Sequence, residues 1–249
     1  MSLTPDVPGR GAWGAKGGLL PLRPGGPGPW YYRAGIGDEP DVGTTFLTGA
    51  DKGDSGRCVH LGVIAIQRRL NDLMGYHLVV DGWYGKATGS AVAAFQAHNG
   101  LVADKTVGPA TMRSLLTPLV EAVAAGLVAP GLLGGIALVE SGLDPGAVGV
   151  TTPFDHGLVQ INLAPGVHDD VLLMAAMDPG YALSWAVKEL VAAHGRWIGH
   201  TVAGVDPWAV AVLNHNSPVN AAVLARTGAY PSVQAGGYVR AVMDAATDW

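Results

Sequence analysis

The chain has 249 residues, of which 49% are hydrophobic and 14% charged, with a formal net charge of −5 and a single cysteine, Cys58. This length allows one large domain or two small ones, and the composition excludes a chain that is disordered throughout. The negative balance gives no electrostatic reason to expect nucleic acid or an anionic membrane as main partner, and one cysteine excludes an intrachain disulfide.

The first 50 residues are dense in glycine and proline and are predicted to form an irregular arm. Two aromatic features, Trp13 and the run 30–32, are unusual for a fully solvated tail, so we expect this arm to dock on a partner or on the rest of the chain. No secretory signal pattern and no apolar run long enough to span a bilayer is present.

Residues 51–117 are predicted to form a compact unit of three helices. Apolar residues recur at helical spacing from Val59 to Leu73, a second helix is expected over 88–98, and a third begins at Pro109. The loops before the second and third helices repeat one pattern, an aspartate, a glycine four residues later and a threonine three residues after that. The repeat members are Asp81, Gly85 and Thr88 in the first copy and Asp104, Gly108 and Thr111 in the second. We interpret these residues as structural.

The motifs of this unit resemble the peptidoglycan-binding domain 1 family, a three-helix module that anchors proteins to the bacterial wall. They are Gln67–Asn71, Asp81–Gly85, Ala91–Gln96, Asn99–Leu101 and Val107–Thr111. Lys105 departs from the family, which usually has glycine at this position, so a less tight loop is expected there. Trp83 and Tyr84 are expected to be exposed turn aromatics that stack on sugar rings, and the alternative for Trp83 is that it packs into the core of the module.

Residues 118–249 are predicted to form a second helical domain. Thr117 and Pro118 look like the start of a helix, and further helices are expected up to Ser141, over 181–194, from Pro207, and around Tyr238. The predicted fold class is therefore mainly α, with the irregular arm at residues 1–50 preceding two helical units.

Glu140 ends an apolar helical run and is the candidate general acid. Burial at such a position disfavours the charged carboxylate and keeps a proton available near neutral pH. The pattern from Glu140 to Ala147, followed by Gly157–Asn162, resembles the first motifs of the soluble lytic transglycosylase and goose-type lysozyme superfamily. The stretches 178–185, 209–218 and 237–239 resemble its later motifs in the same order. The resemblance therefore implies a lysozyme-like domain.

That resemblance implies a role for several residues. Glu140 protonates the oxygen of the β-1,4 bond between N-acetylmuramic acid and N-acetylglucosamine, and Ser141 orients Glu140 or the substrate. The expected substrate-binding residues are Gln160, Asn162, His215, Asn216 and Tyr238, with Asn214 as an alternative to Asn216. The family has tyrosine where this chain has His215, so His215 is either a site residue that titrates near neutrality or a structural helix-end residue.

Hydrolysis and transglycosylation differ in their need for a second carboxylate. Goose-type lysozymes have an aspartate where this chain has Asn162, so the single-acid interpretation, a lytic transglycosylase, is favoured. For hydrolysis, Asp155 is the candidate second carboxylate, with Asp169 and Asp170 as further options.

The predicted protein is a modular peptidoglycan lysin of bacteriophage type. It is expected to need no cofactor, and no zinc-binding, nucleophile-elbow or phosphate-loop motif occurs. We expect delivery either from the host cytoplasm as an endolysin or in a virion tail, where residues 1–50 contact particle proteins. The alternatives are a non-catalytic wall-binding structural protein and an amidase or peptidase that acts on the stem peptide.

Overall fold

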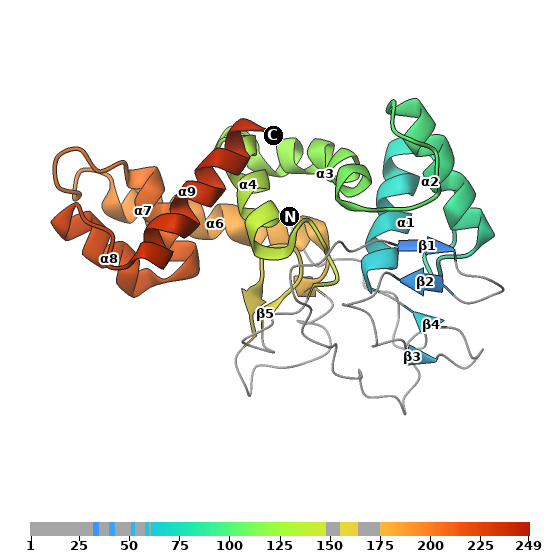
Figure 1. The fold of residues 1–249 in the computed structure, drawn as a ribbon, viewed down its shortest axis with the longest axis horizontal. Helices are drawn as coiled ribbons and strands as arrows, with labels where there is room; N and C mark the ends of the chain where they lie inside the picture. The colour runs from blue at the N-terminus through green and yellow to red at the C-terminus, as the bar shows by residue number, and fades with distance from the viewer. Residues whose placement is uncertain are drawn as a thin grey trace. The chain divides into compact units, whose positions relative to one another are not determined.

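The computed structural model describes residues 61–147, 155–163 and 175–249, and the backbone of short strands between residues 32 and 59. This part of the chain is mainly helical, so the predicted fold class is confirmed (Figure 1). No helix within it has the length and apolar character needed to cross a membrane. Predictions that concern Trp13, Asp169, Asp170 and most of residues 1–50 lie outside the described residues.

Three helices form the first helical module: α1 (Leu61–Met74), α2 (Lys86–His98) and α3 (Pro109–Ala124). Their apolar faces meet in a core, in which Val63, Ile66, Leu70, Val92 and Leu115 are each 0% exposed. These residues lie on one side of each helix because they recur at helical spacing in the sequence.

Two glutamines close the two repeated loops of this module in the same way. The amide nitrogen of Gln67 donates to Oδ1 of Asp81, to the carbonyl of Trp83 and to Oγ1 of Thr88. Oε1 of Gln67 accepts from the backbone amides of residues 81 and 82.

The second loop repeats this arrangement around Gln96. Its amide nitrogen donates to Oδ1 of Asp104, to the carbonyl of Thr106 and to Oγ1 of Thr111, and its Oε1 accepts from the amide of Lys105. Both glutamines are buried, so each loop is closed by hydrogen bonds that water does not weaken. The repeat is therefore structural, as predicted.

Two details of the module differ from the sequence-based prediction. Val59 belongs to the short strand β4 (Cys58–Val59), which pairs with β3 (Asp51–Lys52), and the helix begins only at Leu61. Pro118 does not start a new helix, because α3 continues through it to Ala124. Proline is common in the first turn of a helix, but the continued apolar spacing after it overrides that signal here.

Further strands lie in two hairpins. The strands β1 (Tyr32–Ala34) and β2 (Pro40–Val42) pair antiparallel within residues 1–50. The second hairpin pairs β5 (Asp155–His156) with β6 (Ile161–Asn162). Gly157 starts its turn with φ +75°, and a side chain there would run into the carbonyl of Ala176. Only glycine fits at this position, so the turn is fixed by backbone packing.

Five helices carry most of the remaining chain: α4 (Pro130–Ser141), α6 (Pro179–Trp197), α7 (Pro207–Asn216), α8 (Pro218–Thr227) and α9 (Val233–Thr247). Asp206, Ser217 and Ser232 cap the N-termini of α7, α8 and α9 with side-chain oxygens that accept from backbone amides. The predicted helices up to Ser141, over 181–194, from Pro207 and around Tyr238 are thus confirmed.

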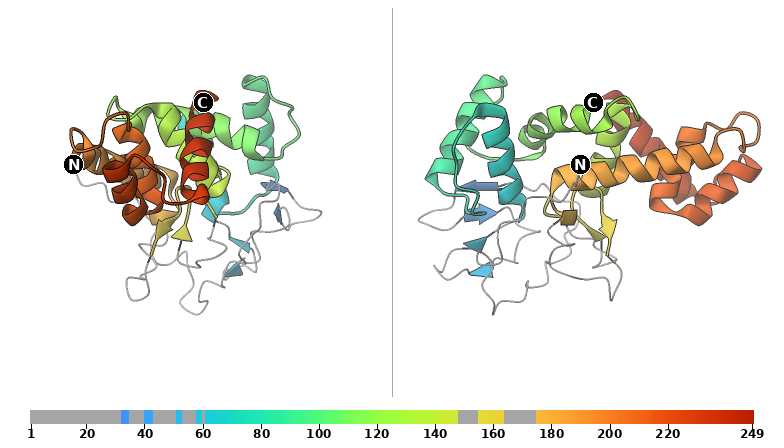
Figure 2. Two further views of the ribbon diagram at one scale, coloured as in Figure 1. Left: turned by 60° about the vertical axis from the view of Figure 1, so that its left-hand side comes forward. Right: turned by 180° about the vertical axis from the view of Figure 1, so that it is seen from behind.

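The helices α4 and α9 pack closely along their length (Figures 1 and 2). Gly131, Gly134 and Gly135 form the contact surface of α4, and a Cβ at Gly135 would lie 2.6 Å from the carbonyl oxygen of Val242. Side chains at Gly131 and Gly134 would meet the backbone of Ala246 and the ring of Trp249. Three glycines at i, i+3 and i+4 spacing thus allow the backbone of α9 to approach α4.

By its contacts the chain divides into two compact units. The first comprises residues 1–118 and 143–182, and the second residues 119–142 and 183–249. The division into residues 1–50, 51–117 and 118–249 stays a prediction.

Candidate active site

Glu140 lies in the last turn of α4, in the second unit. Gly142, two residues later, adopts the left-handed conformation with φ 65° and ends α4 after Ser141, where the helix was predicted to end. The side chain of Glu140 is 16% exposed, so it is mostly buried but still reaches solvent. A carboxyl group in this position can meet a substrate from one side while the protein surrounds it on the others.

Tyr238, on α9, fixes one oxygen of this carboxyl group. Its hydroxyl donates a hydrogen bond of 2.5 Å to Oε1 of Glu140. Burial, together with the charge of Glu140 and this hydrogen bond, raises the pKa of Tyr238 far above its ordinary value. Tyr238 therefore stays protonated at every physiological pH and acts as a permanent donor to Glu140.

His215 approaches the same oxygen from α7. Its Nε2 lies 3.8 Å from Oε1 of Glu140, and its side chain is only 4% exposed. The ring of Trp185, on α6, contacts the imidazole edge-on, with centroids 5.7 Å apart and planes at 66°. The three predicted residues Glu140, His215 and Tyr238 thus meet in one place, each supplied by a different helix.

The other predicted residues of these helices lie as follows. The hydroxyl of Ser141 donates to the carbonyl of Ala137 at 3.0 Å, a bond within its own helix. Asn216 is exposed at the end of α7, whereas Asn214 is buried. Roles in substrate binding for Ser141, Asn214 and Asn216 stay predictions.

The hairpin of the first unit carries Gln160, Asn162 and Asp155. Asp155 and Asn162 face each other across the hairpin, where the amide of Asn162 donates to Oδ1 of Asp155 at 2.6 Å. Gln160 has a positive φ of 50°, and its amide donates to the carbonyl of Gly157 at 2.9 Å. Both amide groups therefore stabilise the hairpin itself, and their contribution to a sugar site stays a prediction.

The two aromatic residues predicted for wall binding behave differently. Tyr84 is 1% exposed and donates from its hydroxyl to the carbonyl of Lys105, so the prediction that it is an exposed turn aromatic is wrong. Burial raises the pKa of Tyr84 as well, with a smaller effect from Asp104. Trp83 is partly exposed and covers Gly85, so its contact with the wall stays a prediction.

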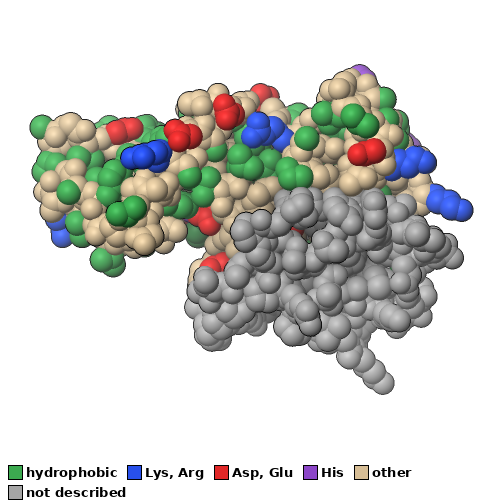
Figure 3. Space-filling view, viewed as in Figure 1, with side chains coloured by type: hydrophobic (Ala, Val, Ile, Leu, Met, Phe, Trp, Pro, Cys, Tyr) green, Lys and Arg blue, Asp and Glu red, His purple; other side chains and the backbone are tan. Residues whose placement is uncertain are grey.

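Within the described residues, no group of three or more His, Cys, Asp or Glu side chains could hold a metal ion. On the face shown in Figure 3, side chains of both signs are scattered among apolar ones. Among the described side chains of that face, no large patch of a single sign of charge is visible.

Comparison with known proteins identifies the first helical module. Residues 60–115 match the sequence model of a family described as a peptidoglycan binding domain. This range contains α1, α2 and the start of α3, so the chain carries a peptidoglycan-binding domain, and the predicted resemblance is confirmed for this part.

One relative is similar over a longer stretch. The chain is 37% identical over 107 residues to the N-acetylmuramoyl-L-alanine amidase CwlM of Mycobacterium tuberculosis. The match covers 39% of this chain and 25% of that protein, so the chain spans about a quarter of the relative's length.

Trp185 was not among the predicted site residues. It lies in the stretch 178–185, which resembles a motif of the superfamily, but that resemblance gave no reason to choose one residue. The glycines of α4 were also not among the predicted features. Their spacing indicates that another helix packs closely against α4 about one turn before Glu140.

Proposed function

We propose that this protein is a glycosidase that cleaves the β-1,4 bond between N-acetylmuramic acid and N-acetylglucosamine, with Glu140 as its single general acid. The observation that carries this proposal is the mostly buried carboxyl group of Glu140, held at Oε1 by the hydroxyl of Tyr238. The peptidoglycan-binding domain at residues 60–115 supports the choice of substrate. A lysozyme-like architecture for the second helical unit is part of this proposal.

The hydrogen bond from Tyr238 defines how the acid works. Because Oε1 accepts from Tyr238, the proton for transfer is carried by Oε2 of Glu140. This proton passes to the glycosidic oxygen, the bond from that oxygen to C1 breaks, and its electron pair stays on the oxygen of the departing N-acetylglucosamine. The developing negative charge on Glu140 is stabilised by the Tyr238 donor.

The second half of the reaction decides the product. In a lytic transglycosylase, the C6 hydroxyl of N-acetylmuramic acid attacks C1 and returns its proton to Glu140, which leaves a 1,6-anhydro ring. In a lysozyme, water attacks C1 and a second carboxylate is required, for which Asp155 is the candidate. We favour the transglycosylase, because Asn162 stands where goose-type lysozymes have an aspartate.

Mass spectrometry of the fragments released from isolated peptidoglycan tests this proposal. Anhydromuramic ends would establish the transglycosylase, whereas reducing muramic ends would establish the lysozyme and direct attention to Asp155. Intact glycan strands with released stem peptides would instead indicate an amidase, the activity named for the mycobacterial relative. No release at all would leave a non-catalytic wall-binding protein.

The variant Glu140→Gln assigns the activity to the site. Glutamine keeps the shape of the side chain but cannot give up a proton, so we expect cleavage to fall at least about 100-fold, with wall binding unchanged. Glu189→Gln is the matched control, because Glu189 is exposed on α6. Equal activity of both variants would refute the assignment.

We further propose that the protein is a bacteriophage lysin, either an endolysin or a component of the virion tail. Removal of residues 1–50 distinguishes the two routes. If the shortened protein cleaves the wall in solution but is not incorporated into particles, the virion route is supported. If neither property changes, residues 1–50 are not a docking segment.

A further inference from the structure

The loop before α3 exposes two side chains that take no part in the packing of the module. Val102 is 79% exposed, and Lys105, three residues later, is also exposed to solvent. The ammonium group of Lys105 forms no ion pair or hydrogen bond with another described residue. The carboxylate of the neighbouring Asp104 accepts instead from Gln96 and from the amide of Thr106. A cation and an apolar side chain are therefore both available to a ligand at this loop.

Lys105 adopts a backbone conformation that is unfavourable for a residue with a side chain. Its φ of 64° lies in the left-handed region, which glycine adopts without strain. The matching loop before α2 has a glycine, Gly82, at this position, with φ 71°. Since one copy makes the turn with glycine, the turn itself does not require lysine. Strained positions cluster where proteins bind their ligands, so the conformation of Lys105 indicates a use for its side chain.

Hydrogen bonds from buried side chains hold Lys105 in place. Oε1 of Gln96 accepts from the amide of Lys105 at 3.0 Å, and the hydroxyl of Tyr84 donates to its carbonyl at 2.8 Å. Gln96 is 2% and Tyr84 1% exposed, so water competes little for these bonds. Both backbone groups of Lys105 are thus fixed before any ligand arrives, which lowers the entropic cost of binding.

We propose that this loop binds the stem peptide of peptidoglycan, with the ammonium group of Lys105 on a carboxylate and Val102 against an alanine methyl group. Both residues lie within the range 60–115 that matches a peptidoglycan binding domain. In intact peptidoglycan the glycan strand is uncharged, because its lactyl groups are in amide linkage, and the stem peptides carry the free carboxylates. The inference rests on this binding domain and is independent of the proposed glycosidase function.

The charge of the protein requires a local cation for such a ligand. The chain has a net charge of −5, so it is not attracted as a whole to an anionic stem peptide. The two arginines of α1, Arg68 and Arg69, already form ion pairs with aspartates. Lys86, at the start of α2, is exposed like Lys105, but it has no left-handed backbone conformation. Lys86 is therefore the matched control for a lysine at the surface of the module.

The experiment measures the affinity of the full chain for purified peptidoglycan sacculi. All variants carry Glu140→Gln as well, so that cleavage does not consume the sacculi. Lys105→Gln should bind about fivefold more weakly, whereas Lys105→Arg, which keeps the charge, should stay within about twofold. Lys86→Gln should bind like the parent protein. Unchanged affinity of Lys105→Gln, or an equal loss in Lys86→Gln, would overturn the proposal.

The variant Lys105→Gly separates binding from folding. Glycine removes both the charge and the backbone strain, so the midpoint of thermal unfolding should rise by about 2–4 °C while affinity for sacculi falls as in Lys105→Gln. Weaker binding by a more stable protein cannot result from unfolding. If Lys105→Gly binds as tightly as the parent protein, the side chain of Lys105 has no role in binding.

The matching loop supplies a control for the apolar contact. Val79 occupies the position that corresponds to Val102 and is 76% exposed, but its loop has Gly82 in place of a lysine. Val102→Ser should weaken binding about two- to fivefold, whereas Val79→Ser should not. Equal losses in both variants would contradict the assignment of the ligand to the loop before α3.

Removal of the stem peptides tests the nature of the ligand. An amidase releases them from the sacculi and leaves glycan strands with free lactyl carboxylates, so a carboxylate is still present without the peptide. The affinity of the parent protein for these strands should fall at least to that of Lys105→Gln for intact sacculi. Equal binding to intact sacculi and denuded strands would show that the loop does not recognise the stem peptide.

Discussion

The hydroxyl of Tyr238 donates to Oε1 of Glu140 at 2.5 Å, although the two residues lie 98 positions apart in the chain. The bond connects the C-terminal end of α4 with α9, whose packing against α4 depends on three glycines. The candidate acid is therefore oriented by a helix contact rather than by its neighbours in the sequence.

Removal of this hydroxyl should weaken catalysis without loss of the fold. In Tyr238→Phe the carboxylate that forms during proton transfer loses a donor worth about 1.5–3 kcal/mol, which corresponds to a fall in kcat of roughly 10- to 100-fold. Cleavage of peptidoglycan fragments measures the effect. Tyr230→Phe is the control, since Tyr230 is 43% exposed in the same unit, and it should change little.

The close contact of α4 and α9 predicts a second effect. In Gly135→Ala the new methyl group would meet the carbonyl of Val242, so the helices must move apart at a cost of about 1–3 kcal/mol in the free energy of unfolding. The shift should also weaken cleavage, because α9 carries Tyr238.

Gly195→Ala provides the matched comparison. Gly195 lies within α6, and a methyl group there has nothing within 4 Å. Alanine should therefore stabilise the protein by about 0.5–1 kcal/mol through its helix propensity. Thermal unfolding measures both variants, and a loss of stability at both positions would contradict the role of the α4–α9 contact.

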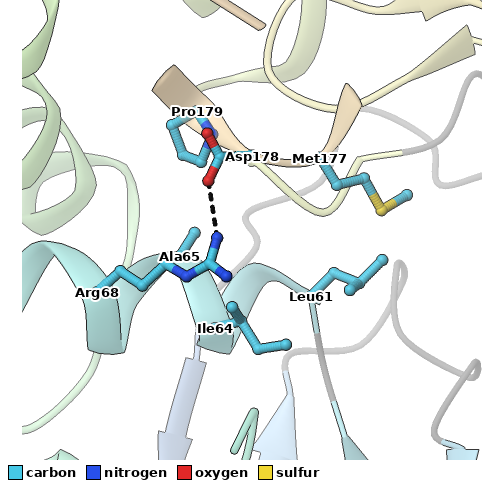
Figure 4. Close-up of a pocket in the computed structure, with 7 residues that line it drawn as sticks. All are labelled: Leu61, Ile64, Ala65, Arg68, Met177, Asp178 and Pro179. Carbon is cyan, nitrogen blue, oxygen red and sulfur yellow. Dashed lines mark hydrogen bonds and ion pairs between the residues drawn. The ribbon is translucent and has the colours of Figure 1, made fainter. Parts of the chain in front are cut away.

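Asp178 caps α6 and binds α1 with its two carboxylate oxygens. Oδ1 accepts from the amide of Tyr181 at 3.0 Å, and Oδ2 pairs with Arg68 at 2.9 Å beside a small pocket that is otherwise mainly apolar (Figure 4). Asp178→Asn keeps a capping side chain and loses only the partly exposed ion pair, at a cost of about 0.5 kcal/mol.

Asp178→Ala loses both interactions, and its cost should be larger by about 1 kcal/mol. Chemical denaturation of the two variants measures the difference. Equal stability of Asp178→Asn and Asp178→Ala would show that the cap contributes nothing.

Lys105 has φ 64°, close to the φ of 71° at Gly82 in the matching loop. The loop therefore adopts the left-handed turn although lysine replaces the glycine usual at this position. The prediction of a less tight loop is not borne out by the φ angle of Lys105. Since a side chain disfavours this conformation, Lys105→Gly should stabilise the protein by about 1 kcal/mol. Lys86→Gly, at the start of α2, should slightly destabilise it, and thermal unfolding distinguishes the two.

The helices were predictable because their signals are local. Caps such as Asp206 before Pro207 and Gly142 after Ser141 report only on neighbouring residues, and apolar spacing gives the buried face. Pro118 shows where local signals fail, because a proline can mark the start of a helix or, as here, lie within one. Tyr84 shows a second failure, because the sequence of a turn does not reveal whether its aromatic side chain is exposed or buried in the core.

The site was predictable only in part. Resemblance selected Glu140, His215 and Tyr238, but no local pattern shows that all three meet at one oxygen. That meeting depends on contacts between helices far apart in the chain, to which Trp185 and the glycines of α4 contribute.

The order of these elements along the chain also affects synthesis. During translation α4 leaves the ribosome well before α9, so the carboxyl group of Glu140 has no Tyr238 to orient it until almost 100 further residues have followed. The peptidoglycan-binding helices are complete by then, because α1 to α3 precede α4. A nascent chain is therefore expected to form its peptidoglycan-binding helices before Glu140 is oriented, and under the proposed function it would gain cleavage activity only after α9 has been made.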